Sequence, residues 1–120
     1  MTPEEKKLLL KDLCCRLPYE VKIHVGKTQR IEVFEDINLC IGSINNTYAD
    51  VKPYLFPLSS LTEEQKEEYV GLQQRVIYNS KGLINSDVME YVNWCYKNHI
   101  DINNLIPMGL ALDATGLNIY

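Results

Sequence analysis

The stretch that decides the fold runs from Lys52 to Gln65 and reads KPYLFPLSSLTEEQ. Each proline fixes its own φ and moves the preceding residue out of the helical region, so residues 52–57 are predicted to be extended. Thr62 has the features of a helix N-cap, because its hydroxyl can accept from the Gln65 amide while the Gln65 side chain bonds the cap amide. The stretch therefore predicts an extended strap, residues 52–61, that ends by starting a helix.

Length and composition indicate one globular domain, residues 1–120. The chain has 120 residues, of which 46% are hydrophobic and 23% charged, as in an ordinary domain with a real core. Its net charge is −4, and residues 61–120 hold eight acidic against four basic residues. Without a basic patch the chain lacks the charge pattern of a nucleic-acid-binding protein, so a nucleic-acid partner is not expected.

The four cysteines, Cys14, Cys15, Cys40 and Cys95, show no metal-ligand spacing. The chain begins with charged residues, and it has no apolar run near the roughly 20 residues that span a membrane. We therefore expect buried, reduced thiols in a cytoplasmic protein with no membrane partner.

The first half predicts a helix followed by strands. Thr2 and Glu5 form a second capping pattern, and an apolar stripe of Leu9, Leu13 and Leu17 with Cys14 beside it indicates a helix over residues 1–17. Residues 19–51 alternate as an antiparallel meander of short strands. The predicted strands are Val21–Val25, Arg30–Phe34, Ile37–Ile41 and Thr47–Val51, with reversals at 26–28 and 45–46 and a bulge at Gly42.

The second half predicts a helical pair, residues 62–99, broken at 79–82, and a docked tail, residues 100–120. Asp101 is expected to cap one turn of the tail, and Leu110, Leu112 and Ala114 alternate like a short strand. The predicted fold class is α+β: an N-terminal helix, a small antiparallel β-meander or SH3-like partial barrel, two further helices and a short C-terminal strand.

Separated blocks across nearly the whole chain carry a resemblance. They are Leu17–Tyr19, Lys52–Leu55, Pro57–Glu64, Trp94–Ile106 and Gly109–Leu112. In these blocks the chain resembles small uncharacterised proteins of phages, prophages and mobile elements of Bacteroides-type bacteria. Those proteins often have a basic residue where this chain has Phe56, which argues against a general anion site in the strap. The resemblance implies a biological context and no chemistry.

No catalytic, metal or cofactor site is predicted. The residue types that hydrolases use are present without a recognised arrangement; they are His24, His99, Ser59, Ser60, Asp101 and Asp113. No phosphate loop or dinucleotide fingerprint occurs, and no carboxylate or histidine spacing matches a metal site.

One ligand-binding site is predicted at the strap. Tyr54, Phe56 and Trp94 would supply aromatic walls, and Ser59 and Ser60 would supply donors beside the helix start at residue 62. The competing interpretation places the three aromatics in the core and gives the hydroxyls only capping roles, because apolar residues between prolines are usually buried.

Three functional hypotheses follow. The first is a non-enzymatic phage or mobile-element accessory protein that binds a host component, either a host protein or a small signalling molecule. The second is a nucleotide-binding sponge that sequesters a defence signal beneath the strap, and the third is a small hydrolase with no recognisable motif. An exposed strand edge at residues 47–51 would also allow a homo-oligomer to form.

Overall fold

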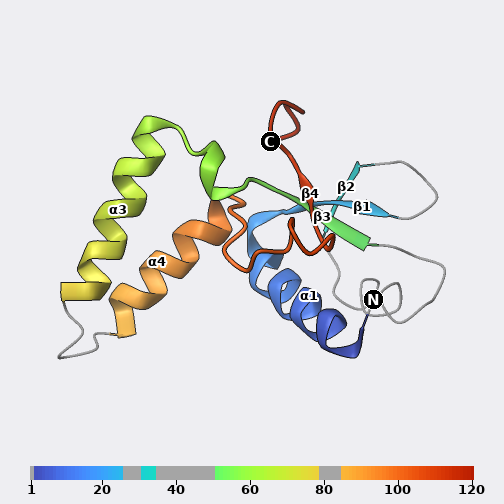
Figure 1. The fold of residues 1–120 in the computed structure, drawn as a ribbon, viewed down its shortest axis with the longest axis horizontal. Coiled ribbons are helices and arrows are strands. Elements are labelled where there is room, and N and C mark those ends of the chain that lie inside the picture. Colours follow the sequence, from blue (N-terminus) through green and yellow to red (C-terminus); the bar gives the residue numbers. More distant parts are fainter. Residues whose placement is uncertain (1, 26–30, 35–50, 79–84) are drawn as a thin grey trace.

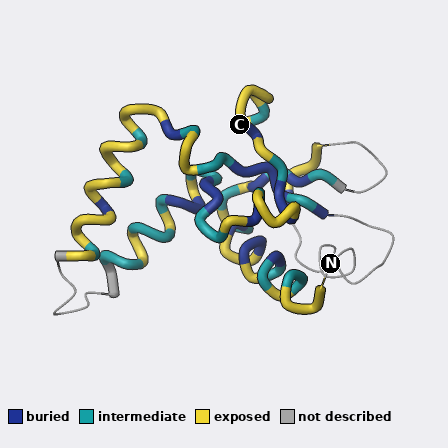
Figure 2. The backbone as a smooth tube through the Cα atoms, viewed as in Figure 1, coloured by how far each residue is buried: buried dark blue, intermediate teal, exposed yellow. Residues whose placement is uncertain are grey.

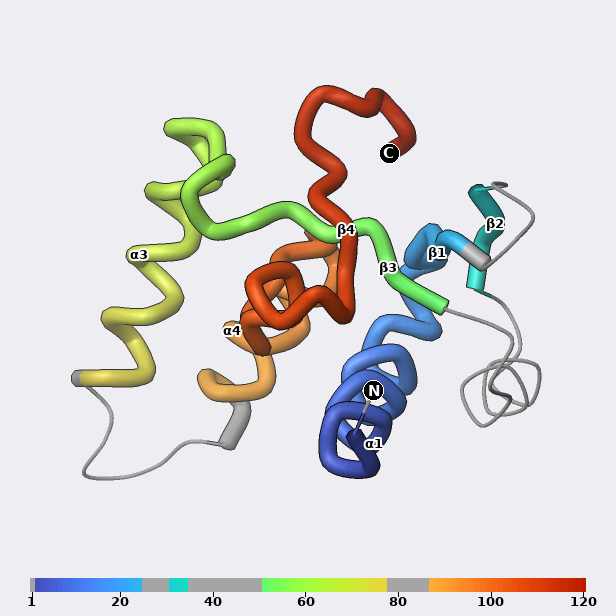
Figure 3. The backbone as a smooth tube through the Cα atoms, turned by 45° about the vertical axis from the view of Figure 1, so that its right-hand side comes forward, coloured from blue at the N-terminus to red at the C-terminus, as the bar shows by residue number. Residues whose placement is uncertain are grey.

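The computed structural model describes residues 2–25, 31–34, 51–78 and 85–120, and it confirms the predicted α+β class (Figure 1). A helix packs against one face of a sheet, and a pair of antiparallel helices extends to one side (Figures 1 and 3). The helices are α1 (Pro3–Arg16), α3 (Glu63–Tyr78) and α4 (Asn85–Lys97), with 3-10 turns at Leu17–Tyr19 and Leu58–Ser60. The strands are β1 (Lys22–Val25), β2 (Ile31–Val33), β3 (Val51–Leu55) and β4 (Leu112–Asp113).

Both predicted helix starts are confirmed as reciprocal capping boxes. The Thr2 hydroxyl accepts from the Glu5 amide at 3.1 Å, and the Glu5 carboxylate accepts from the Thr2 amide at 3.3 Å. The same exchange joins Thr62 and Gln65 at 3.2 and 3.0 Å. Each cap satisfies amides that the first helical turn leaves without partners, and such a cap is typically worth about 1 kcal/mol.

The strap corrects the sequence interpretation, because its first part is a central strand of the sheet. Strand order is β2-β1-β3-β4 among the described residues, so β3 lies between β1 and β4. Pro53 stands opposite Ile23 in the antiparallel pair, and Tyr54 stands opposite Leu112 in the parallel pair. The parallel ladder begins one residue after Pro53, so it does not require the amide that proline lacks.

The sheet is mixed rather than wholly antiparallel, because β4 runs parallel to β3. The predicted strand at 37–41, the bulge at Gly42 and the reversals at 26–28 and 45–46 lie outside the described residues, as does the helix break at 79–82. Of the proposed self-association edge, only Val51 is described. It pairs with Val25 of β1, and β4 pairs with β3 only at Tyr54 and Leu55, so the edge stays a prediction.

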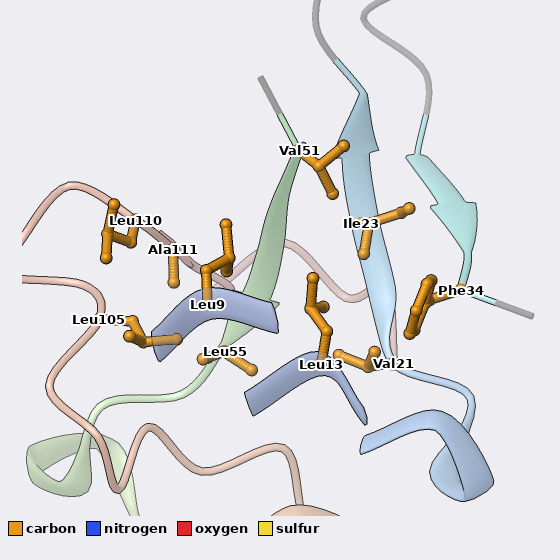
Figure 4. Packing of buried hydrophobic residues seen from close by; sticks show 10 residues of the cluster. All are labelled: Leu9, Leu13, Val21, Ile23, Phe34, Val51, Leu55, Leu105, Leu110 and Ala111. Atoms are coloured by element: carbon orange, nitrogen blue, oxygen red, sulfur yellow. The ribbon is translucent and has the colours of Figure 1, made fainter. Parts of the chain in front are cut away.

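The main core lies between α1 and the sheet (Figure 4). Leu9 and Leu13, both fully buried, point from α1 toward Ile23 and Val51 on the strands. The complete buried cluster is Leu9, Leu13, Val21, Ile23, Phe34, Val51, Leu55, Leu105, Leu110 and Ala111. The tail thus supplies core side chains, and the predicted capping of its turn is confirmed, because the Asp101 carboxylate accepts from the amides of Leu105 and Ile106.

The expectation of buried thiols is wrong for two of the three described cysteines. Cys14 and Cys15 are exposed, and Cys95 is buried. The core face of α1 carries Leu9, Asp12, Leu13 and Arg16, at the i, i+3, i+4, i+7 spacing of one helix face. Residues 14 and 15 point away from that face because successive helical residues are about 100° apart.

A smaller cluster joins the helical pair to the end of β3. Leu61, Cys95 and Ile100 are buried there, and Phe56, Tyr69, Tyr91, Trp94 and Ile102 pack around them. Phe56 and Ile100 form an isolated parallel bridge, with the Phe56 amide bonded to the His99 carbonyl at 2.8 Å and the Asp101 amide bonded to the Phe56 carbonyl at 2.9 Å. No helix in the described residues is long and apolar enough to cross a membrane.

Candidate functional site

The structure places the five residues of the predicted strap site in different surroundings. Tyr54 is buried in β3, with its ring edge-on to His24 at 6.4 Å between centroids. Phe56 and Trp94 belong to the smaller cluster and are partly buried. Ser59 is exposed, and the Ser60 hydroxyl donates to the Pro57 carbonyl at 2.7 Å. The structure therefore brings Phe56 and Trp94 into one cluster and places Tyr54 elsewhere.

Trp94 instead lines a shallow hollow between α3 and α4. The hollow has a volume of about 200 Å³, and its lining residues are Glu68, Leu72, Arg75, Glu90 and Trp94. The Trp94 indole donates to Glu68 at 2.8 Å, and Arg75 pairs with Glu90 at 3.2 Å across the two helices. Both contacts bridge the helices, so they hold the hollow in its shape.

Aromatic rings pack beside this hollow. Tyr69 lies 5.6 Å from Tyr91 and 6.1 Å from Trp94, measured between ring centroids and with tilted planes. The Tyr91 hydroxyl donates to the Tyr69 hydroxyl at 3.0 Å. Burial, followed by this hydrogen bond, raises the pKa of Tyr91 well above its usual value. Tyr91 therefore stays neutral at physiological pH.

A buried polar network connects α1 to the tail. The Arg16 Nε donates to Asp12 at 2.7 Å, and its Nη2 donates to Asp12 at 3.1 Å and to the Ile100 carbonyl at 2.7 Å. Asn103 adds a third donor to the Asp12 carboxylate at 2.8 Å. The guanidinium carbon lies 4.8 Å from the centre of the Tyr96 ring, and Arg16 is fully buried. This network fixes where α4 ends relative to α1.

The end of α4 holds a histidine in an unusual backbone conformation. His99 has φ of 59°, while its amide bonds the Tyr96 carbonyl and the next amide, of Ile100, bonds the Cys95 carbonyl. These two bonds form a Schellman C-cap, in which glycine is the usual left-handed residue. Histidine adopts this left-handed conformation more often than most residues other than glycine, at a modest backbone cost.

The His99 ring is stacked against Tyr120, with 3.8 Å between centroids and 15° between planes. The Tyr120 hydroxyl accepts from the Lys22 amide at 2.8 Å and donates to the Tyr54 carbonyl at 2.7 Å. The Phe56 ring also packs against Tyr120, with 5.7 Å between the ring centroids. Tyr120 thus fastens the closing segment, residues 115–120, to β1, β3 and the end of α4. Figure 3 shows the backbone of this segment turning back after β4.

Electrostatics at this contact keep both rings neutral. Burial, with help from the positive charges of Arg16 and Lys22, lowers the pKa of His99 from 6.5 to about 4. Burial also raises the pKa of Tyr120 to about 12. The Nδ1 of His99 has no hydrogen-bond partner within the described residues.

The geometry does not assemble a reaction centre from the residue types considered above. Both Asp101 oxygens are occupied by backbone amides, and Asp113 accepts from the Thr115 amide at 2.8 Å. Burial raises the pKa of the Cys95 thiol to about 11, so it is not a thiolate nucleophile. Within the described ranges, no three His, Cys, Asp or Glu side chains are grouped to hold a metal ion.

Sequence reasoning missed the polar network and the Tyr120 contact. Asp12 and Arg16 carry a readable signal, because they are spaced i, i+4 on the same face as Leu9 and Leu13. Tyr120 carries none, since its partners lie 66 and 98 residues away in the chain.

Replacing Tyr120 with phenylalanine is expected to lower the free energy of unfolding by about 1–2 kcal/mol. The change removes two hydrogen bonds, each worth about 0.5–1.5 kcal/mol, while the ring remains stacked on His99. Tyr120→Ala should cost more, because it also removes the ring. Urea unfolding of the three proteins measures both steps, and equal stability of wild type and Tyr120→Phe would contradict the hydrogen-bonding role.

No protein-family model matches the chain, and the searches of curated proteins and of solved structures found no significant match either.

Proposed function

We propose that this chain is a non-enzymatic accessory protein that binds a host protein through the α3–α4 hairpin. The observation that carries the proposal is the exposure of this hairpin. Among the described side chains of α3 only Leu72 is buried, and Figure 2 shows the helix exposed along most of its length. The main core cluster contains no α3 residue among those described, so most of the helix surface is open to a partner.

Apolar side chains lie exposed on the hairpin. Ile77, near the end of α3, is 61% exposed, and Met89, near the start of α4, is 59% exposed. Because the two helices are antiparallel, both residues lie toward the same end of the hairpin (Figure 1). Such side chains can supply the apolar area that the core of a protein interface buries.

A protein partner fits the hairpin better than a small molecule. The hollow beside Trp94 measures about 200 Å³, below the roughly 300–1,000 Å³ of ordinary ligand pockets. A larger furrow on α3, of about 420 Å³, is wide open to solvent and lined by one helix, so it would leave most of a small molecule uncovered. Helices α3 and α4 together carry six acidic and three basic residues, which disfavours nucleic acid. The resemblance to phage and mobile-element proteins supports a host component as the partner.

The test is co-purification from host cells with wild-type protein and with an Ile77→Asp/Met89→Asp variant, followed by calorimetry with the identified partner. The variant is expected to bind at least tenfold more weakly, because it places two charges in the contact. Met108→Asp is the matched control, since Met108 is also exposed and apolar, at 45%, but lies in the tail. Equal loss in both variants would contradict a hairpin site.

Two further measurements distinguish the other hypotheses. Turnover of a phosphoester, amide or glycoside that is lost on changing His24 or His99 would overturn the non-enzymatic proposal. A rise in melting temperature with linear or cyclic nucleotides would support the sponge instead, because a ligand that binds the native state stabilises it.

A further inference from the structure

We propose that the outer face of α3 binds a basic amphipathic helix of the partner protein, which crosses α3 at Gly71. The inference rests on the proposed function and specifies which surface of the hairpin makes the contact. The outer face is defined by Glu63, Lys66, Glu67, Val70, Gly71, Gln74 and Ile77.

These residues share one side of α3. Tyr69, Leu72 and Val76 face α4 and the small cluster, and the outer residues lie on the opposite side of the helix. All seven are exposed, and six of them line an open furrow along the helix, with only Ile77 outside it. The face therefore has a shape that an elongated partner segment can follow.

Gly71 is the feature that points to a close helix crossing. A glycine within a helix costs about 1 kcal/mol relative to alanine. A Cβ placed on Gly71 would meet no atom within 4 Å, so packing inside this chain does not require the glycine. Small residues let a second backbone approach closely, and Val70 and Ile77 supply apolar contact on either side along the helix.

The charge of this face selects the partner. The face itself holds Glu63 and Glu67 against Lys66, a net charge of −1, and Lys66 is paired with Glu63 at 3.4 Å. The neighbouring Glu64 and Glu68 bring the net charge of residues 63–68 to −3. Residues 69–78 carry one charge, Arg75, which pairs with Glu90 on the α4 side. The outer face is thus acidic at one end and apolar at the other, and a helix with lysine or arginine beside an apolar stripe is complementary to it.

The test uses the intact protein and two labelled 18-residue helical peptides of defined sequence. One has leucine on one face and lysine elsewhere, and the second has glutamate in place of every lysine. Fluorescence anisotropy is expected to show micromolar binding of the lysine peptide, weakening with added salt, and no binding of the glutamate peptide. Lack of binding by the lysine peptide would overturn the inference.

Variants locate the contact. Gly71→Trp fills the furrow and should weaken binding of the lysine peptide at least tenfold. Gln73→Trp adds a tryptophan on a different side of α3 and should change the affinity for this peptide less than twofold. Glu63→Gln/Glu67→Gln should weaken binding more than Glu4→Gln/Glu32→Gln, which removes the same charge elsewhere. Equal effects within either pair would mean nonspecific attraction and would overturn the inference.

Gly71→Ala separates binding from folding. The melting temperature should rise by about 2–6 °C, because alanine is the better helix former and its Cβ meets free space. Peptide affinity should fall in the same variant. A rise in stability with unchanged affinity would show that no backbone approaches Gly71.

The outcomes also distinguish this inference from the proposed function. The host partner's binding could be lost with Ile77→Asp/Met89→Asp and be unaffected by Gly71→Trp. That result would support the hairpin as the binding site and would overturn the inference that the outer face makes the contact. A concentration-dependent dimer in sedimentation that Gly71→Trp abolishes would identify a second copy as the occupant and overturn the basic helix.

Discussion

Replacing Asp12 with alanine is expected to lower the free energy of unfolding by about 3–5 kcal/mol, the largest effect of any single change considered. The substitution leaves the fully buried Arg16 guanidinium with one hydrogen bond, to the Ile100 carbonyl, and removes its counter-charge. An uncompensated buried charge costs that much because its desolvation is no longer offset. Domains of this size have total stabilities of about 5–15 kcal/mol, so a large fraction is lost.

A double variant shows that the cost comes from the unpaired charge. Asp12→Leu/Arg16→Met replaces the whole pair with apolar side chains and should recover most of the lost stability, since such replacements are often neutral or stabilising. Glu90→Ala is the matched control, because Glu90 also pairs with an arginine, Arg75, but both side chains are 54% exposed. That control should cost no more than about 1 kcal/mol.

The stability of all three variants is measured by urea unfolding. A shift of the midpoint with an unchanged dependence of free energy on urea concentration reports the change in stability. If Asp12→Ala lowers the free energy of unfolding no more than Glu90→Ala does, the buried network does not stabilise the fold as its geometry indicates. If the double variant is as unstable as the single one, the loss comes from poor packing and not from the charge.

Local signals in the sequence predicted local structure correctly. The two capping boxes at Thr2 and Thr62 need only residues three positions apart, and both form. The Leu9 and Leu13 stripe needs only helical periodicity, and both residues are buried. Contacts within one turn of helix are fixed by the chain itself, so they can be inferred without the fold.

Features that depend on distant segments were not predictable in the same way. Residues 52–57 were correctly expected to be extended, but Leu58–Ser60 of the predicted strap, residues 52–61, form a 3-10 turn. The place of β3 in the sheet depends on β4, whose Leu112 lies 58 residues beyond its partner Tyr54. Tyr54 was grouped with Trp94 as one site, and the register of β3 directs Tyr54 to His24 instead. Side chains alternate along a strand, so the partner strand decides which neighbours they meet.

Acidification should destabilise this protein through His99. The folded pKa is lowered to about 4 from 6.5, so the unfolded chain binds the proton more tightly. The contribution of His99 to the free energy of unfolding is therefore fully present above pH 6.5. It falls as the pH drops from 6.5 to 4 and is absent below that range. With about 1.4 kcal/mol for each unit of pKa difference, the loss amounts to about 3 kcal/mol.

The physical cause lies in what surrounds the imidazole. A proton on His99 would place a positive charge in a partly buried site near Arg16 and Lys22, against the face of Tyr120. His99→Asn is the control, because asparagine tolerates the left-handed conformation that φ of 59° requires and does not titrate. The variant should lose the part of the pH dependence that His99 supplies, whatever its stability at pH 7.

Urea unfolding between pH 7.5 and 4.5, followed by Trp94 fluorescence, measures this difference, and the His99 ring protons should titrate with a midpoint near 4. Identical slopes in the two proteins, or a midpoint near 6.5, would show that the imidazole is free to take up a proton and that burial beside Arg16 and Lys22 does not exclude its charge.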